Sequence, residues 1–344
     1  MIQLFDIDQA SRWDEIVKTF GEYDVYYLSG YVKAFMIHED SNPYLIFYED
    51  NGLRAIYVFM LRHTVKSGVF DSITPYGYGG VLFDGNATEE NKKAFWVAYL
   101  AEMKGINIID NFVRYHPVIA NAVTMKGITN VIDLGKTVAM DLTSPEVIWD
   151  NIHSKNRNMI RKAEKNGIEI HHGKGLRLFK DFRRIYNTTM QKNNADGYYY
   201  FGEKFYESIH NDLNDNYEMF WATYEGKIVA MSIMIFANGR LNYHLSGSDI
   251  EYRNLAPSNL LLYKAALWGC EQGMKTFLLG GGVGSGEDNL FKFKIAFNMN
   301  SDYQFSIGKE IFDQAQYDQL VKLRAESDVS FNINSKFFPL YRSL

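Results

Sequence analysis

The strongest constraint on the fold is an internal repeat, because the two halves of the chain carry the same order of strand and turn signals. Residues 43–61 read PYLIFYEDNGLRAIYVFML, two apolar runs separated by Asp50-Asn51-Gly52. Residues 217–236 repeat this pattern, with Glu225-Gly226-Lys227 between the runs. Tight turns favour such glycine-containing sequences, so each stretch predicts a β-hairpin.

Each hairpin is followed along the chain by a helical pattern that stops at a glycine and then by a further strand. The apolar period changes from helical to extended after Gly105 in the first half and after Gly273 in the second. A hairpin with a later crossover helix predicts a mixed sheet with a right-handed β-α-β connection near its end. The predicted fold class is therefore α/β, with two mixed α+β sheets in tandem.

The boundary between the two predicted domains lies near residue 143. There Thr143-Ser144-Pro145-Glu146 combines a capping box with an early proline, which is the pattern of a helix start. The predicted domains are residues 1–143 and 144–326. Residues 327–344 lack a clear period and form a predicted C-terminal extension, either packed on the body or partly loose.

Composition and charge exclude several classes of protein. The chain has 344 residues, 47% of them hydrophobic, so it can bury a full core, and its net charge of -5 argues against a DNA-binding protein. The single cysteine, Cys270, excludes intramolecular disulfides and Cys-cluster zinc sites, and no histidines have metalloprotease spacing, so no metal is expected. Without a signal-peptide pattern or a long uncharged apolar window, we expect a cytoplasmic protein with no transmembrane segment.

Residues 144–165, if helical throughout, carry a row of cations on one face. Arg157, Arg161 and Lys165 recur every four residues, opposite an apolar stripe. Such a row is commonly a solvated helix face. From Lys155 to Lys165, however, only Glu164 interrupts the basic residues, so a phosphate or pyrophosphate partner is the alternative.

A glycine-rich loop and an aromatic run follow the last predicted strand, in residues 278–297. The loop lacks the Gly-Lys-Ser/Thr ending of a nucleotide-hydrolysing loop, so its glycines can simply allow a tight turn. The run is compatible with a half-buried edge strand or a short helix. It sets two lysines among three phenylalanines, a candidate for a shaped cation site: Phe291, Lys292, Phe293, Lys294 and Phe297.

Two aromatic segments of the first half, PYGYGG and FVRYHP, stand where predicted strands end, and open α/β sheets bind ligands at strand ends. Tyr76, Tyr78, Arg114 and His116 are therefore candidates for a pocket wall. The alternative is a tyrosine-rich turn beside a structural arginine. Residues 193–201 add a polar loop with an aromatic platform that includes Tyr199.

Residues 251–273 resemble the segment of GNAT acetyltransferases in which a helix N-terminus binds the CoA pyrophosphate. Arg253 matches the basic residue at its start, but Ala256 and Ser258 stand where the family has glycines, and Pro257 removes one amide. The resemblance implies a degenerate CoA site. The alternative is an ordinary crossover helix with Ser258 as its N-cap.

Most of the chain resembles the FemAB family, the non-ribosomal peptidyl transferases that build peptidoglycan cross-bridges. The most specific matches are SKNRNMIRKAEKNGIEIHHG, the stretch from residue 245 to residue 282, and Phe293, Lys294 and Phe297, which fit the family's Phe-Lys-x-x-Phe ending. The resemblance implies two GNAT-like domains, with the acceptor held by residues 1–143 and the donor by residues 144–326. The long helical hairpin of some members is missing, because the chain between Asp181 and Tyr217 is too short.

The same resemblance implies transfer of an aminoacyl or acyl group to an amine of a cell-envelope precursor. It implies aminoacyl-tRNA or acyl-CoA as co-substrate with no tightly bound cofactor, and a UDP- or lipid-linked acceptor, and it leaves peripheral membrane contact open. Two alternatives remain. One is an acyl-CoA-dependent N-acyltransferase acting on a nucleotide-linked amino sugar in surface polysaccharide synthesis, and the other is a non-catalytic module that binds a glycan or nucleotide.

Acyl transfer to an amine needs no covalent enzyme intermediate, which suits a sequence with no recognisable nucleophile constellation. We expect Lys294 to stabilise the tetrahedral intermediate or relay its proton, and Phe293 to shape the donor channel. The remaining predicted roles are donor phosphate binding by Arg157, Arg161, Lys165 and Arg253, and acceptor binding by Tyr76, Tyr78, Arg114, His116 and Tyr199.

Overall fold

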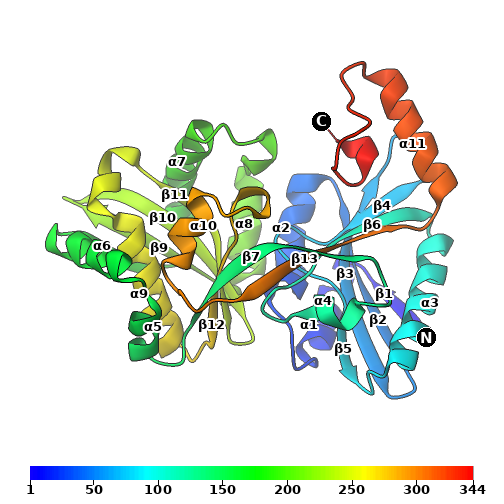
Figure 1. Cartoon of the computed structure of the whole chain (residues 1–344), viewed down its shortest axis with the longest axis horizontal. Helices are drawn as coiled ribbons and strands as arrows, with labels where there is room; N and C mark the ends of the chain where they lie inside the picture. The colour runs from blue at the N-terminus through cyan, green and yellow to red at the C-terminus, as the bar shows by residue number, and fades with distance from the viewer. Residues whose placement is uncertain (344) are drawn as a thin grey trace. The chain divides into compact units, whose positions relative to one another are not determined.

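The computed structural model describes residues 1–343, which form two compact units. Unit 1 consists of Met1–Leu134 and the C-terminal stretch from Phe305, and unit 2 consists of Gly135–Gln304 (Figure 1). The division therefore differs from the expected one, which ended the first domain at residue 143 and assigned residues 305–326 to the second. The physical reason is strand pairing, since strand β13 (Tyr303–Ile311) forms an antiparallel ladder with β6 of unit 1.

Unit 1 contains a mixed sheet of order β1-β2-β3-β4-β6-β13, with the short strand β5 paired to β3. Neighbouring strands in this sheet are antiparallel except for β4 and β6, which run parallel. The further strands are β1 (Ile2–Phe5), β2 (Asn42–Asp50), β3 (Leu53–His63), β4 (Phe70–Ile73), β5 (Leu82–Gly85) and β6 (Ile108–Arg114), and the helices are α1 (Ala10–Lys18), α2 (Ser29–Glu39), α3 (Glu89–Gly105), α4 (Asn121–Met125) and α11 (Gln314–Ser327).

Unit 2 contains a second mixed sheet, of order β7-β12-β11-β10-β9-β8, in which β11 and β12 run parallel. Its strands are β7 (Val131–Asp141), which begins in unit 1, β8 (Glu169–Gly173), β9 (Tyr217–Tyr224), β10 (Lys227–Ala237), β11 (Arg240–Ser248) and β12 (Thr276–Gly280), and its helices are α5 (Pro145–Asn151), α6 (Ser154–Lys165), α7 (Leu176–Lys192), α8 (Glu203–Asp212), α9 (Pro257–Glu271) and α10 (Asn289–Ile295).

Both predicted hairpins are present. β2 pairs with β3 across a turn at Asn51 (φ 48°) and Gly52 (φ 75°), and β9 pairs with β10 across a turn at Glu225 (φ 49°) and Gly226 (φ 74°). Positive φ at both central residues defines the type I′ turn, whose twist matches that of the paired strands. The turn chemistry of the sequence thus fixes the register of each hairpin.

The predicted crossover helices and mixed sheets are also confirmed. α3 ends at Gly105 before β6, and α9 ends at Glu271, two residues before Gly273 (φ 73°), which leads toward β12. In each unit this helix lies in the chain between two parallel strands, β4 and β6 in unit 1 and β11 and β12 in unit 2. The two halves therefore share one plan, as the repeat in the sequence predicts.

The cationic segment after residue 144 does not stay helical. α5 starts as expected, with the Ser144 side chain accepting the Val147 N–H and Pro145 in the first turn. It ends at Asn151, because Ile152 is extended (φ -73°, ψ 129°) and the His153 N–H donates to the Ala296 carbonyl at 2.9 Å. α6 then begins as a separate helix. Residues 144–165 are therefore not helical throughout, as the predicted row of cations on one face assumed.

The C-terminal segment packs on unit 1 and is not loose. Tyr317 and Leu320 of α11 and Tyr341 near the end of the chain form a buried cluster with Val69 and Ile109. Leu344, the last residue of the expected extension, lies outside the described residues. Within residues 1–343, no helix combines the length and apolar character needed to span a bilayer.

We expect Gly247→Ala to destabilise unit 2. A Cβ at Gly247 of β11 would lie 2.8 Å from the backbone N and Cα of Tyr186 on α7, and backbone cannot rotate away as a side chain can. Overpacking of this kind costs about 1–3 kcal/mol. Urea unfolding of the variant measures the loss, and Gly197→Ala, whose Cβ meets nothing within 4 Å, is the control. Equal stability of the two variants would contradict the close approach of α7.

Candidate functional site

The two parallel strands of unit 2 pair over a short distance and then part. The ladder between β11 and β12 runs from Arg240↔Thr276 to Asn242↔Leu278. β11 then takes an extra residue at His244, where its register with β10 shifts, and continues beside β10 to Ser248. Bulges of this kind are enriched beside active sites. The carboxyl end of β12 is therefore where unit 2 offers an opening in its sheet.

A glycine-rich loop turns sharply at this end of β12. Gly280 (φ 82°) and Gly284 (φ 60°) adopt left-handed conformations that favour glycine. A Cβ at Gly282 would overlap the Gly286 carbonyl and the Asp288 carboxylate, so the loop closes tightly around that carboxylate. Asp288 Oδ1 accepts the Phe291 N–H at 2.8 Å and Oδ2 accepts the Val283 N–H at 3.2 Å. These backbone hydrogen bonds lower the pKa of Asp288.

α10 follows this cap and carries Lys294, which settles the open choice between strand and helix. Lys294 is only 9% exposed, and its Nζ donates to the Gly281 carbonyl at 2.7 Å. Burial lowers the pKa of Lys294 to about 8, although the nearby Asp288 carboxylate opposes this shift. The ammonium form therefore predominates at neutral pH and is lost as the pH rises through about 8.

The Lys294 ammonium keeps donors to spare. An ammonium has three protons, and within residues 1–343 the Gly281 carbonyl is the one acceptor recorded for Nζ. A preformed cation with unused donors can stabilise an oxyanion where strands part. Phe293, the other predicted catalytic-site residue, is half-buried and packs edge-on against Phe297 with ring centroids 5.4 Å apart.

Buried amides join α10 to α6 and α9. Asn156, 4% exposed, donates to the Ala296 carbonyl at 3.2 Å and accepts from the Asn259 side chain at 2.7 Å. Ala296 directly follows α10, so the beginning of α6 holds the end of the helix that carries Lys294. Sequence reasoning missed both Asn156 and Asp288, although a lone aspartate before an apolar helix is a recognisable N-cap signal.

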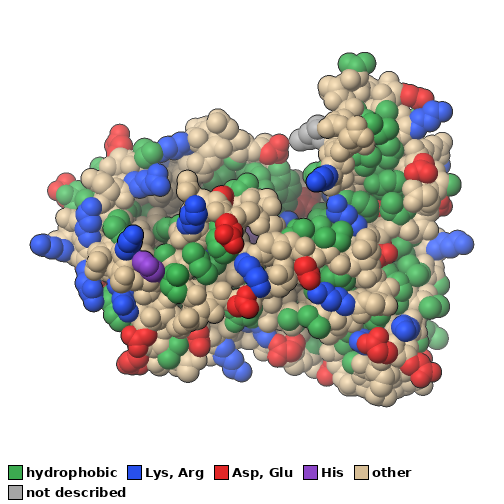
Figure 2. Space-filling model, in the orientation of Figure 1, with side chains coloured by type: hydrophobic (Ala, Val, Ile, Leu, Met, Phe, Trp, Pro, Cys, Tyr) green, Lys and Arg blue, Asp and Glu red, His purple; other side chains and the backbone are tan. Residues whose placement is uncertain are grey.

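Two of the predicted phosphate-binding arginines lie over the same tryptophan ring. The guanidinium carbons of Arg157 and Arg161 lie 5.9 and 5.0 Å from the centre of the Trp149 ring, and Arg157 also donates to the Trp149 carbonyl at 3.3 Å. Lys165 is exposed in the last turn of α6. Exposed Arg253 belongs to a short 3₁₀ helix, Ile250–Leu255, which packs against α6. Figure 2 shows Lys and Arg side chains gathered over α6, at the left of the view.

The N-terminus of α9 offers few amides to a pyrophosphate. Ala256, not Ser258, is the N-cap residue, and it adopts the left-handed conformation (φ 58°) that glycine would take more easily. Pro257 has no N–H, and the N–H groups of Asn259 and Leu260 donate back to the Ala256 carbonyl. The alternative of Ser258 as N-cap is therefore wrong, and a CoA-type phosphate would meet a poor cradle.

In unit 1 the equivalent parallel strands do not open in the same way. Beyond the β4 and β6 ladder, the Gly79 N–H donates to the Arg114 carbonyl at 2.7 Å, and Gly79 forms a parallel bridge with Tyr115. The PYGYGG loop thus fills the space at the strand ends. Gly77 (φ 92°) is required there, because a Cβ would come within 2.5 Å of the Tyr26 ring.

Arg114 is held as a rigid fork in unit 1. Its Nε donates to the Gly77 carbonyl at 2.8 Å, and its guanidinium carbon lies 5.2 Å from the centre of the Phe305 ring. No partner for its two terminal nitrogens is recorded within the described residues. Tyr78 contacts the Tyr26, His116 and Phe305 rings, with centroids 5.6 to 5.8 Å apart, and burial raises its pKa. Tyr76 stacks on Phe35.

His116 and Tyr199 have different surroundings from the rest of the predicted acceptor site. The His116 side chain is fully buried, and its Nε2 lies 2.9 Å from Asp24 Oδ2. Its Nδ1 accepts the Ile119 N–H, so the neutral ring donates from Nε2 to the carboxylate. His116 thus braces the loop from within. Tyr199, half-buried in unit 2, packs edge-on against Tyr198.

Comparisons with known proteins agree on the fold. No curated protein matches the sequence. A family model described as an acetyltransferase (GNAT) domain matches residues 153–292. Among solved structures, FemX is similar with a TM-score of 0.69 and 14% identity over 92% of this chain and 99% of that chain.

Two other solved structures are similar over nearly the same length. A conserved protein of unknown function from Bacteroides thetaiotaomicron has a TM-score of 0.59 and 11% identity over 90% of this chain and 100% of that chain. The C-terminal domain of a putative lysylphosphatidylglycerol synthetase from Agrobacterium fabrum has a TM-score of 0.54 and 12% identity over 90% and 92%. The chain has the FemX fold, and the part that matches the GNAT model lies in unit 2. The predicted FemAB resemblance is thus confirmed at the level of the fold.

The GNAT match spans most of the geometry described for unit 2. It starts at His153, runs through α6 and the parted strands, and reaches Lys292 in α10. Lys294 lies two residues beyond it. Within residues 1–343 no group of three or more His, Cys, Asp or Glu side chains is placed to hold a metal ion.

The burial of Lys294 predicts a pKa that can be measured. Its side-chain amine should titrate near pH 8, and Asp288→Asn should lower this pKa further, because the variant removes a negative charge that favours the ammonium. Asparagine still caps a helix, so α10 should stay folded. NMR of 13Cε-labelled lysine measures both values, with Glu287→Gln, an exposed neighbour, as control. A Lys294 pKa above 10 in the parent would contradict the buried position.

Proposed function

We propose that the protein transfers an aminoacyl or acyl group from an activated donor to an amine of a cell-envelope precursor such as a peptidoglycan peptide. The observation that carries the proposal is the buried Lys294 ammonium, tethered to Gly281 where β11 and β12 part. The FemX fold and the GNAT match support the reaction class. A second similar structure, from a putative lysylphosphatidylglycerol synthetase, supports a cell-envelope acceptor.

The proposed reaction is direct acyl transfer. The neutral acceptor amine attacks the donor carbonyl, a C–N bond forms, and the bond from the carbonyl carbon to the leaving oxygen or sulfur breaks. Charge develops on the carbonyl oxygen in between, and Lys294 is proposed to stabilise it with a donor not used by Gly281. A pKa of about 8 also allows Lys294 to donate a proton to the leaving group and to take up the proton that the attacking nitrogen loses. Phe293 is proposed to line the donor channel.

The donor and acceptor are proposed to bind on different units. Arg157, Arg161, Lys165 and Arg253, on and beside α6, are proposed to meet the donor phosphates. The Arg114 fork, with Tyr76 and Tyr78, is proposed to bind an anionic group of the acceptor, because a guanidinium with both terminal nitrogens available suits a carboxylate or phosphate. Tyr199 is proposed to add an aromatic surface, and buried His116 supports the loop through Asp24.

Aminoacyl-tRNA is the preferred donor and acyl-CoA is the rival. The GNAT match favours acyl-CoA. Against it, Pro257 and the bonded amides of Asn259 and Leu260 leave a poor pyrophosphate cradle at the start of α9. A thermal-shift screen with acyl-CoAs, charged tRNA, UDP-linked muropeptides and UDP-amino sugars separates the candidates, since a ligand at 100 times its Kd adds about 2.7 kcal/mol. Stabilisation by acyl-CoA and a UDP-amino sugar alone would favour the rival.

Lys294→Met tests the catalytic role. The variant deletes the charge and keeps the apolar stem, so we expect turnover to fall about a hundred- to a thousandfold with acceptor binding unchanged. Its melting temperature at pH 7 should equal or exceed that of the parent, because burying the Lys294 cation destabilises the folded parent protein. Steady-state kinetics with the donor found in the screen measures the loss. Lys292→Met on the same helix is the exposed control, and full turnover of Lys294→Met would end the assignment.

The α6 cations have a separate test. Removing Arg161 and Lys165 together, by alanine, should weaken donor binding and flatten its dependence on ionic strength, because exposed charges act on phosphates through a screened field. Both side chains are exposed, so the melting temperature should change little. The matched control is the double alanine variant of Lys192 and Lys204, exposed cations of the same unit. Equal salt dependence in both variants would favour the solvated-face alternative.

A further inference from the structure

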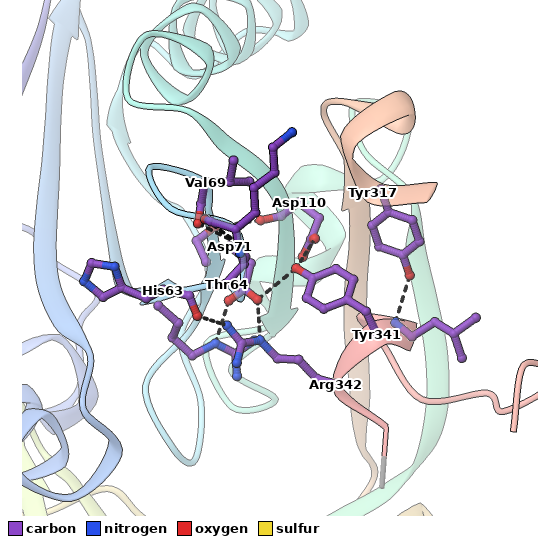
Figure 3. A network of polar contacts seen from close by, with 12 residues as sticks. His63, Thr64, Val69, Asp71, Asp110, Tyr317, Tyr341 and Arg342 are labelled. Carbon is purple, nitrogen blue, oxygen red and sulfur yellow. Dashed lines mark hydrogen bonds and ion pairs between the residues drawn. The ribbon is translucent and has the colours of Figure 1, made fainter. Parts of the chain in front are cut away.

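The C-terminal segment of the chain is fastened to unit 1 through two buried aspartates (Figure 3). Asp71 on β4 and Asp110 on β6 are inaccessible to solvent. Between them lies the phenol of Tyr341, whose oxygen is 2.9 Å from Asp71 Oδ2 and 2.7 Å from Asp110 Oδ2. Two neighbouring parallel strands thus supply the carboxyl groups, and the end of the chain supplies the group between them.

Asp71 is the ionised member of the pair. Arg62 Nε donates to its Oδ1 at 2.6 Å, and Arg342 Nε donates to its Oδ2. Arg342 also donates to the His63 carbonyl at 2.7 Å, which fixes the guanidinium against β3. Two arginines directed at one carboxylate hold the negative charge on Asp71.

The proton count around Tyr341 requires Asp110 to be protonated. A phenol has one proton and can donate to one carboxylate, so two short contacts need a second proton between the same three oxygens. Asp110 is the group that can hold it, because its Oδ1 is buried and has no hydrogen-bond partner within the described residues. An ionised oxygen would be costly in that position. Burial, with the Asp71 charge, raises the pKa of Asp110 to about 7.

We propose that a proton held between Asp110 and Tyr341 latches residues 339–343 onto unit 1, and that loss of this proton at higher pH loosens the segment. Without it, two carboxylates and a phenol oxygen face one another in a buried site. The latch thus makes the end of the chain a pH-sensitive element, separate from the proposed acyl transfer and independent of it.

The sign of the effect follows from the groups packed around Asp110. Asp71 raises its pKa, while Arg62, Arg342 and the Tyr341 hydrogen bond lower it, and burial is the largest cause. Tyr317 of α11 faces the same site, and its phenol oxygen accepts the Leu340 N–H at 2.9 Å. With a folded pKa above the ordinary 3.8, the stabilisation is present in acid and is lost as the pH rises toward about 7.

Hydrogen exchange on the full chain tests the latch. The N–H groups of Leu340, Arg342 and Ser343 are bonded within the segment or to Tyr317 and report its opening. After correction for intrinsic exchange, their protection should fall by up to about tenfold per pH unit between pH 5 and 7 and level off above about pH 8. Protection that stays constant or rises over this range overturns the proposal.

Asp110→Asn keeps the shape and supplies a permanent donor to Tyr341, so its protection should not depend on pH. Glu310→Gln is the matched control, because burial also raises the pKa of Glu310, which lies in unit 1 on β13 and bonds the Asn130 N–H instead of the segment. The control should keep the parent's pH dependence. An Asp110→Asn protein with the parent's pH dependence overturns the proposal, and if that variant does not fold, the parent and Glu310→Gln profiles decide it.

Discussion

The short parallel ladder between β11 and β12 is the constraint on which the geometry of unit 2 depends. Because the ladder ends at Asn242 and Leu278, the chain after β12 has no strand to follow on that side and must turn. Left-handed glycines make the turn, Asp288 closes it by capping α10, and the cap sets Lys294 within 2.7 Å of the Gly281 carbonyl. The buried cation therefore follows from where two strands stop pairing.

The duplicated plan is used differently in the two units. In unit 1 a parallel bridge between Gly79 and Tyr115 continues the pairing beyond the ends of β4 and β6, and aromatic rings pack there. In unit 2 the corresponding ends of β11 and β12 part. The buried pair of His116 and Asp24 braces this filling, and Arg114 is left at its surface as a fixed cation. The parallel strands thus part in unit 2, whereas in unit 1 their ends are covered by packed aromatic side chains.

The repeated order of strands and helices could be predicted because it depends on signals between adjacent residues. The features that could not be predicted depend on contacts between residues far apart in the sequence. Hairpin turns and helix-ending glycines depend on a few adjacent residues, so both sheets could be predicted. The break at Ile152 depends on the Ala296 carbonyl, and the burial of His116 depends on Asp24, far away in sequence. The aromatic run left Lys292 and Lys294 as candidates, and the FemAB resemblance selected Lys294. The lowered pKa of Lys294 depends on the packed structure.

The return of the chain to unit 1 also sets an order of events during synthesis. β6 pairs with β4 on one side and with β13 on the other, yet about 190 residues that include nearly all of unit 2 are translated between β6 and β13. Until β13 emerges, β6 remains an unpaired edge open to wrong partners. Unit 2 is contiguous in sequence, so the half of the protein that is made later can finish folding first.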